Sequence, residues 1–149
     1  MNLQKAFLIT FLGNYITNTV VAALVALVPA SAVPGMLTPQ YITFVVLAAI
    51  VVGLLAAWQG VRSINAAAIF GAIGFGVSLA VAFVSGVAGV LTQTGDLGQV
   101  AAVIPNFGPF LLSWSTLVLL GYWMIPSLLV GFMMGRGNAS PAPAGSPVM

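Results

Sequence analysis

The sequence contains no cysteine and no histidine, and only four of its 149 residues carry a formal charge. Without cysteine the chain has no disulfide, no thiolate nucleophile and no Cys-ligated metal. Without histidine it lacks the commonest metal ligand, the usual haem ligand and the commonest acid–base group. We therefore expect no metal and no cofactor. Binding of a quinone or pigment through amides, carbonyls or aromatic rings stays open.

The small number of charged residues also indicates whether water or lipid surrounds the protein. A soluble domain has about a quarter of its residues charged, whereas this chain has 3% charged and 61% hydrophobic residues. Such a surface faces lipid, so the sequence predicts an integral membrane protein whose first partner is the bilayer. Three cations are too few to indicate nucleic-acid binding.

Four apolar segments are long enough to cross a membrane, which takes about 20 helical residues. They cover about residues 6–28, 41–61, 66–91 and 110–134, and Pro- and Gly-rich stretches separate them. We expect an all-α integral membrane protein, a four-transmembrane-helix bundle over residues 1–134. A short surface helix is expected within the third connection, over residues 97–104. The Pro-rich residues 135–149 are expected to form a disordered tail.

Four spans place both termini on one side of the membrane, and the charges indicate which side. Lys5, Arg62 and Arg136 then share one side, and Asp96 lies on the other. The excess of cations in cytoplasmic segments predicts that both termini are cytoplasmic, in a plasma or inner membrane.

A cleaved signal peptide is the alternative interpretation of the first span. "MNLQK" resembles a charged n-region, and "ASA" at 30–32 resembles a cleavage site. The apolar run is longer than a usual signal-peptide core and carries Asn14 and Asn18, so we expect the first span to be retained.

The third span carries small residues at steps of 4, 3, 4, 4, 3 and 4. In lipid, small residues allow helix backbones to approach closely, so this stripe predicts a helix-packing face. The alternative is a stripe that arises from composition alone, because the whole span is rich in Gly, Ala and Ser. The stripe comprises Ala67, Gly71, Gly74, Ser78, Ala82, Ser85 and Gly89.

Two amides, Asn14 and Asn18, lie near the middle of the first span. Unmet polar groups cost several kcal/mol in hydrocarbon, so this face must meet protein or water. Pro126 in the fourth span lacks an amide hydrogen and leaves the Tyr122 carbonyl without its helical donor. We expect an Asn to donate to that carbonyl. The same cluster could instead line a cavity or pore, or an oligomer interface. It comprises Thr10, Asn14, Thr17, Asn18, Tyr122, Pro126 and Ser127.

The predicted membrane interior has no carboxylate, histidine or activated nucleophile. This excludes the usual proton-coupled transporters and intramembrane hydrolases, so we expect no enzyme activity. The sequence favours a non-catalytic accessory or assembly subunit that associates with other integral membrane subunits. The alternative is a small self-associating channel or facilitator for an uncharged or weakly charged solute. The shortness of the polar stripe argues against that alternative, because a pore needs polar residues along a whole helix face.

Overall fold

The computed structural model of the protein describes residues 2–28, 38–101 and 103–136, and every regular element in these ranges is a helix. Four helical segments are long and apolar enough to cross a membrane. The predicted all-helical chain with four such segments is therefore confirmed. The elements are α1 (Leu3–Ile16), the π-helical η1 (Thr17–Val21), α2 (Ala22–Val25), α3 (Pro39–Gln59), α4 (Ile64–Thr94), α5 (Leu97–Val100), α6 (Val103–Leu111) and α7 (Trp114–Arg136).

Some predicted bounds require correction. The first candidate span is Leu3–Val25, and the last is Trp114–Arg136, so the helix continues two residues into the segment predicted as a tail. The remainder of that tail, residues 137–149, and the alternative cleavage site at 30–32 lie outside the described residues.

The helix ends are explained by local sequence. The side chains of Asn2, Thr38 and Ser63 each accept a hydrogen bond from a first-turn amide, as N-caps do. At the other ends, Gly60 and Gly95 adopt left-handed conformations with φ of 76° and 66°. Glycine takes this conformation without the steric cost of a Cβ, and so it ends α3 and α4.

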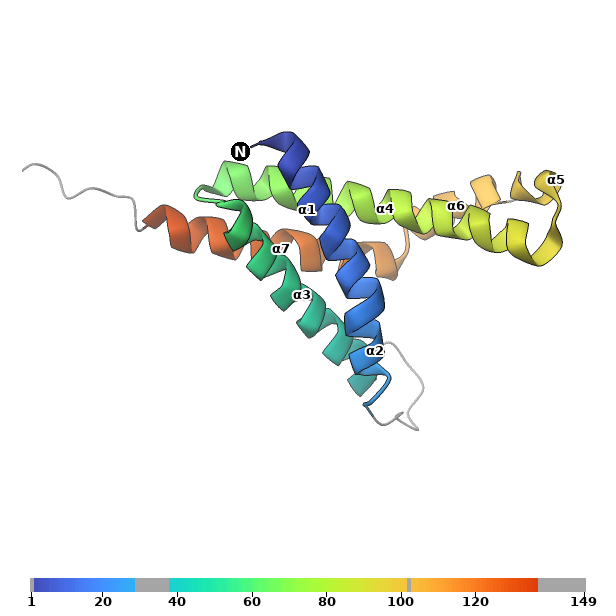
Figure 1. The fold of residues 1–149 in the computed structure, drawn as a ribbon, viewed down its shortest axis with the longest axis horizontal. Coiled ribbons are helices and arrows are strands. Elements are labelled where there is room, and N and C mark those ends of the chain that lie inside the picture. Colours follow the sequence, from blue (N-terminus) through green and yellow to red (C-terminus); the bar gives the residue numbers. More distant parts are fainter. Residues whose placement is uncertain (1, 29–37, 102, 137–149) are drawn as a thin grey trace, which may run out of the picture.

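The candidate spans form two pairs that cross at an angle (Figure 1). In the first pair, α1, η1 and α2 run antiparallel to α3, and in the second α4 lies alongside α7. The helix ends that carry Lys5, Arg62 and Arg136, hereafter the cation end, lie on one side of the molecule. At the opposite end, hereafter the Asp96 end, the two pairs diverge (Figure 1).

Helix α4 has 31 residues and is therefore about 46 Å long, well beyond the roughly 30 Å of a hydrocarbon core. Beside its last turns lie α5 and α6, where Phe107 packs edge-on against Phe83 at a centroid distance of 5.1 Å. The third connection was expected to hold one surface helix over 97–104, but it holds two short helices. The second ends at Leu111, so α7 begins later than expected.

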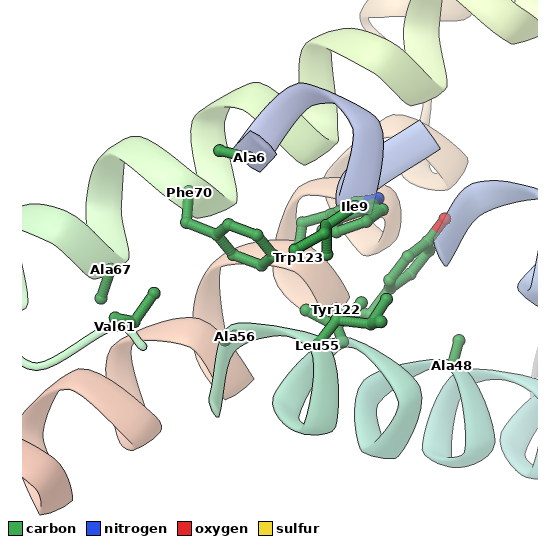
Figure 2. Close-up of a cluster of buried hydrophobic side chains, with 11 residues drawn as sticks. Ala6, Ile9, Ala48, Leu55, Ala56, Val61, Ala67, Phe70, Tyr122 and Trp123 are labelled. Atoms are coloured by element: carbon green, nitrogen blue, oxygen red, sulfur yellow. The ribbon is translucent and has the colours of Figure 1, made fainter. Parts of the chain in front are cut away.

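The core is centred on Trp123, which is fully buried (Figure 2). Phe70 meets its ring edge-on, with centroids 6.3 Å apart. The indole Nε1 donates to the Ser78 hydroxyl at 2.8 Å. Gly74 lies directly against the same ring, and a Cβ at this position would overlap it. This glycine therefore lets α4 and α7 approach closely, as small residues do between membrane helices.

Candidate functional site

Near the cation end, α4 and α7 are in close contact beside an open surface pocket of about 540 Å³ whose wall includes Arg62, Gly131 and Arg136. A Cβ on Gly131 would lie 2.6 Å from the Ala67 Cβ and 2.7 Å from the Ser63 carbonyl oxygen. Val61 is 1% exposed, and Gln59 ties α3 to the start of α1 through a 3.2 Å bond to the Asn2 carbonyl. Between the two pairs, Ala6 and Ile9 of α1 and Ala56 of α3 belong to the same buried cluster as Ala67, Phe70 and Trp123 of α4 and α7. Apolar side chains therefore fill the space between the pairs toward this end.

A cavity of about 510 Å³ lies between the two pairs, from mid-span toward the Asp96 end. It is partly open, and all four candidate spans and α6 contribute to its wall. No charged side chain of the described residues lines it. Its polar lining consists of Asn14, Asn18, Tyr41, Ser78, Ser85, Ser115 and Tyr122. Its apolar lining consists of Phe44, Val45, Val81, Ala82, Phe110, Val118 and Leu119.

Three of the four polar residues of the stripe in the first span are buried, and the fourth, Asn18, is exposed. Thr10, Asn14 and Thr17 are 0%, 3% and 1% exposed. The Thr10 hydroxyl donates to the Phe7 carbonyl at 2.9 Å, and the Thr17 hydroxyl donates to the Gly13 carbonyl at 2.8 Å. Both hydroxyls are therefore satisfied within their own helix, and neither threonine lines the cavity.

The two amides differ from these threonines because both line the cavity. Asn18 Nδ2 donates to the Asn14 backbone carbonyl at 2.9 Å and also to the Asn14 side-chain oxygen. A backbone carbonyl can only accept, so this bond fixes which end of the Asn18 amide is nitrogen. Asn14 must then present its oxygen to Asn18. Its own Nδ2 is buried and has no partner among the described residues.

The expected bond from an Asn to the Tyr122 carbonyl is not found in the part of the chain that the structure describes, and this expectation is corrected. Asn18 finds its acceptors one turn back on its own helix instead. The Pro126 side chain lies on the α3 side of α7, where a Cβ on Gly53 would be 3.7 Å from it.

The predicted polar cluster accordingly divides into two groups. Asn14, Asn18 and Tyr122 meet at the cavity. Ser127 is fully buried, but its hydroxyl donates to the Trp123 carbonyl at 2.6 Å within α7. It is thus satisfied locally, like the two threonines. The predicted cluster contained residues of the first and fourth spans, and α3 and α4 also contribute to the cavity wall.

The small-residue stripe of α4 lies in two different environments, the contact with α7 and the cavity wall. Ala67, Gly71, Gly74 and Ser78 are buried, and the structure places all four against α7. Beyond them, Ala82 and Ser85 line the cavity, and Gly89 faces open space. The stripe thus begins as a close helix contact and continues into the cavity wall.

The irregular helix at Thr17–Val21 and the buried Trp123 are features that sequence reasoning missed. A π-helical turn leaves no clear residue signature, although such turns are frequent at functional sites. The sequence around Trp123, with Gly121, Tyr122, Pro126 and Ser127 close by, gave one indication that this residue lies inside the protein. Its hydrogen-bond partner could not be predicted, because Ser78 lies 45 positions away in the sequence.

The cavity offers neutral donors, neutral acceptors and aromatic rings. Hydroxyls of this kind act as nucleophiles only beside a base, and no described residue on the cavity wall is one. The cavity wall therefore offers hydrogen bonds and aromatic contacts to a bound molecule. Comparison with family models, with curated proteins and with solved structures finds nothing that matches this chain.

Proposed function

We propose that this protein is a non-catalytic accessory or assembly subunit of a larger integral membrane complex. One observation carries the proposal: Thr10, Asn14, Thr17 and Ser127 are buried inside the chain, while the outer faces of the four candidate spans are apolar and exposed. The exposed set is spread over all four spans and includes Leu8, Phe11, Ile50, Leu54, Ile69, Val84, Leu117 and Leu129.

An apolar outer face suits both lipid and partner helices. In a bilayer, an apolar face does not drive the association of helices by itself, because lipid tails are equally apolar. A partner subunit would therefore recognise the shape of this protein and the few polar groups on its surface. The Asp96 end offers the more distinctive shape. There α4 extends beyond the other spans, and Leu112, between α6 and α7, is 90% exposed. We assign the main contact with other subunits to this end.

The alternative, a homo-oligomeric channel lined by the polar stripe, is less well supported. A pore between copies would need the stripe on the outside of each copy. Instead Thr10, Asn14 and Thr17 are buried inside one chain, and Asn18 alone of the four polar residues of the stripe is exposed. A pore within one chain would need polar residues across roughly 30 Å. The buried cluster around Ile9, Phe70 and Trp123 interrupts such a path.

We further propose that the protein is oriented with the cation end, and hence both termini, in the cytoplasm of a cell with a plasma or inner membrane. The support is the separation of charge along the helices. Lys5, Arg62 and Arg136 belong to one end, and Asp96 follows a helix about 46 Å long that begins there.

Extraction in a mild detergent, followed by measurement of mass and subunit composition, tests the proposal. The expected result is a defined complex with larger, different chains in a fixed ratio. Leu112→Gln should lower the amount of the partner chains recovered with this protein, because it places a polar amide on the exposed Asp96 end, where the partners are proposed to bind. Leu3→Gln, at an exposed position of the cation end, is the matched control and should not. Recovery of this chain only with copies of itself would favour the channel instead.

A further inference from the structure

We propose that the cavity between the two helix pairs binds a neutral, lipid-soluble carbonyl compound, whose oxygen accepts a hydrogen bond from the Asn14 amide. This inference goes beyond a role as an accessory subunit, and it would stand if that role were disproved. It rests on four features of the cavity: an unpaired donor, the absence of charge, the depth of the donor in the membrane, and the aromatic wall.

The unpaired donor is Asn14 Nδ2. The Asn14 side chain is 3% exposed and lines the cavity, and its oxygen is already engaged by Asn18. A buried donor without a partner costs about 1–3 kcal/mol, and more in hydrocarbon. The neighbouring hydroxyl of Thr17 escapes this cost by bonding to its own helix. No acceptor for the Asn14 amide lies among the described residues, so an acceptor carried by a ligand would satisfy it.

The absence of charge defines the ligand as neutral. The four charged residues of the chain are Lys5, Arg62, Asp96 and Arg136, and none of them lines the cavity. An ion in this position would lose its hydration without gaining a counter-charge, which is prohibitively costly in a medium of low dielectric constant. A carbonyl oxygen accepts from an amide without bringing a charge with it.

The depth of Asn14 excludes a phospholipid headgroup. Asn14 is the central residue of Leu3–Val25, with 11 residues on either side, and is therefore about 16 Å from each end. Phospholipid carbonyls lie beside a charged phosphate at the membrane interface, and the hydrocarbon core is roughly 30 Å thick. A phospholipid that reached Asn14 would bury its phosphate. The ligand must therefore carry its carbonyl without a charged headgroup.

The side chains of the cavity wall indicate the chemical nature of the rest of the ligand. Tyr41, Phe44, Phe110 and Tyr122 give aromatic surface, and the volume of about 510 Å³ falls within the range of roughly 300–1,000 Å³ of small-molecule sites. The cavity is partly open between the diverging pairs, so an apolar tail can extend from it into lipid. Two kinds of membrane molecule share this chemistry: a quinone with an isoprenoid tail and a diacylglycerol.

The first experiment identifies what the protein retains. The full chain is purified from its own membrane in mild detergent without added lipid, and bound molecules are extracted and weighed by mass spectrometry. We expect a neutral carbonyl compound in near-stoichiometric amount. Asn14→Leu should lose it. Thr17→Val is the matched control, because Thr17 is equally buried, lies one turn away and does not line the cavity. It should retain the compound.

The second experiment measures the binding of decylubiquinone and of dioctanoylglycerol to delipidated protein in detergent. Loss of one buried hydrogen bond should weaken binding about tenfold in Asn14→Leu. Thr17→Val should bind as the parent does. Ser85→Leu leaves the amide in place and fills part of the cavity, so it should also weaken binding. It keeps the test decisive if Asn14→Leu fails to fold.

The outcomes separate the two sources. Binding of decylubiquinone alone assigns the site to a quinone, and binding of dioctanoylglycerol alone assigns it to a glyceride. If the parent retains no carbonyl compound and binds neither probe, the cavity holds only water and the proposal is overturned. Binding by Asn14→Leu as tight as by the parent would equally overturn it, since the amide would then make no contact with the ligand.

Discussion

Replacing Gly74 with alanine adds one methyl group at the closest contact between α4 and α7. The new Cβ would overlap the ring of Trp123. That ring cannot easily turn away, because its Nε1 is bonded to Ser78 at 2.8 Å and its face is packed against Phe70. Relief therefore requires α4 and α7 to separate, which weakens the whole contact. We expect Gly74→Ala to destabilise the protein.

The size of the effect follows from three contributions. Overpacking costs about 1–3 kcal/mol. Strain or loss of the bond between Trp123 and Ser78 adds about 0.6 kcal/mol, a typical value between membrane helices. Alanine gains about 0.5–1 kcal/mol over glycine within a helix. Gly76→Ala is the matched control, because a Cβ there meets nothing within 4 Å and gains the same helix term. The two variants should differ by about 2–4 kcal/mol.

The assay is unfolding from bicelles by increasing SDS, followed by far-ultraviolet circular dichroism, with both variants measured beside the parent. Gly76→Ala should match or exceed the stability of the parent, and Gly74→Ala should fall below it. Equal stability of the two variants would refute the close contact between α4 and α7.

Three further outcomes are expected. In intact cells, Thr94→Cys should react with a membrane-impermeant thiol reagent and Asn65→Cys should not, because the cation end is proposed to be cytoplasmic; the reverse labelling would invert the topology. Gly131→Ala should cost about 1–3 kcal/mol in the same SDS titration, because its Cβ would lie 2.7 Å from the Ser63 carbonyl oxygen; full stability would show that the cation end is loosely packed. Thr17→Val should cost less than about 1 kcal/mol, because its hydroxyl bonds only within its own helix; a larger loss would reveal a partner elsewhere.

The four apolar segments could be read from the sequence because span length and hydropathy are local properties. Helix α3 ends at Gln59, two residues before the expected end, and α4 ends at Thr94, three residues after it. The end of α6 was not predicted, because its length depends on packing against α4. Phe83 and Phe107 pack together in that contact, and no local sequence pattern predicts that these two residues meet.

The candidate site was predicted in part. A helix wheel correctly indicated that Asn14 belongs to a protein-facing side, since apolar residues cover the rest of the helix. It could not choose the partner, because partners depend on the crossing angle of the two pairs. The proposed bond to the Tyr122 carbonyl also assumed that Asn18 had no acceptor nearby. The Asn14 backbone carbonyl, one turn away, was available throughout.

The most direct test of an inward polar stripe on a one-ended cavity is solute flux. Proteoliposomes are mixed with glycerol or urea in a stopped-flow instrument, and light scattering follows the change in vesicle volume. We expect permeability equal to that of protein-free vesicles, because the buried cluster around Ile9, Phe70 and Trp123 fills the space between the pairs toward the cation end. Permeability several-fold higher, and lost in Asn14→Leu, would contradict a closed end and identify the cavity as part of a pore.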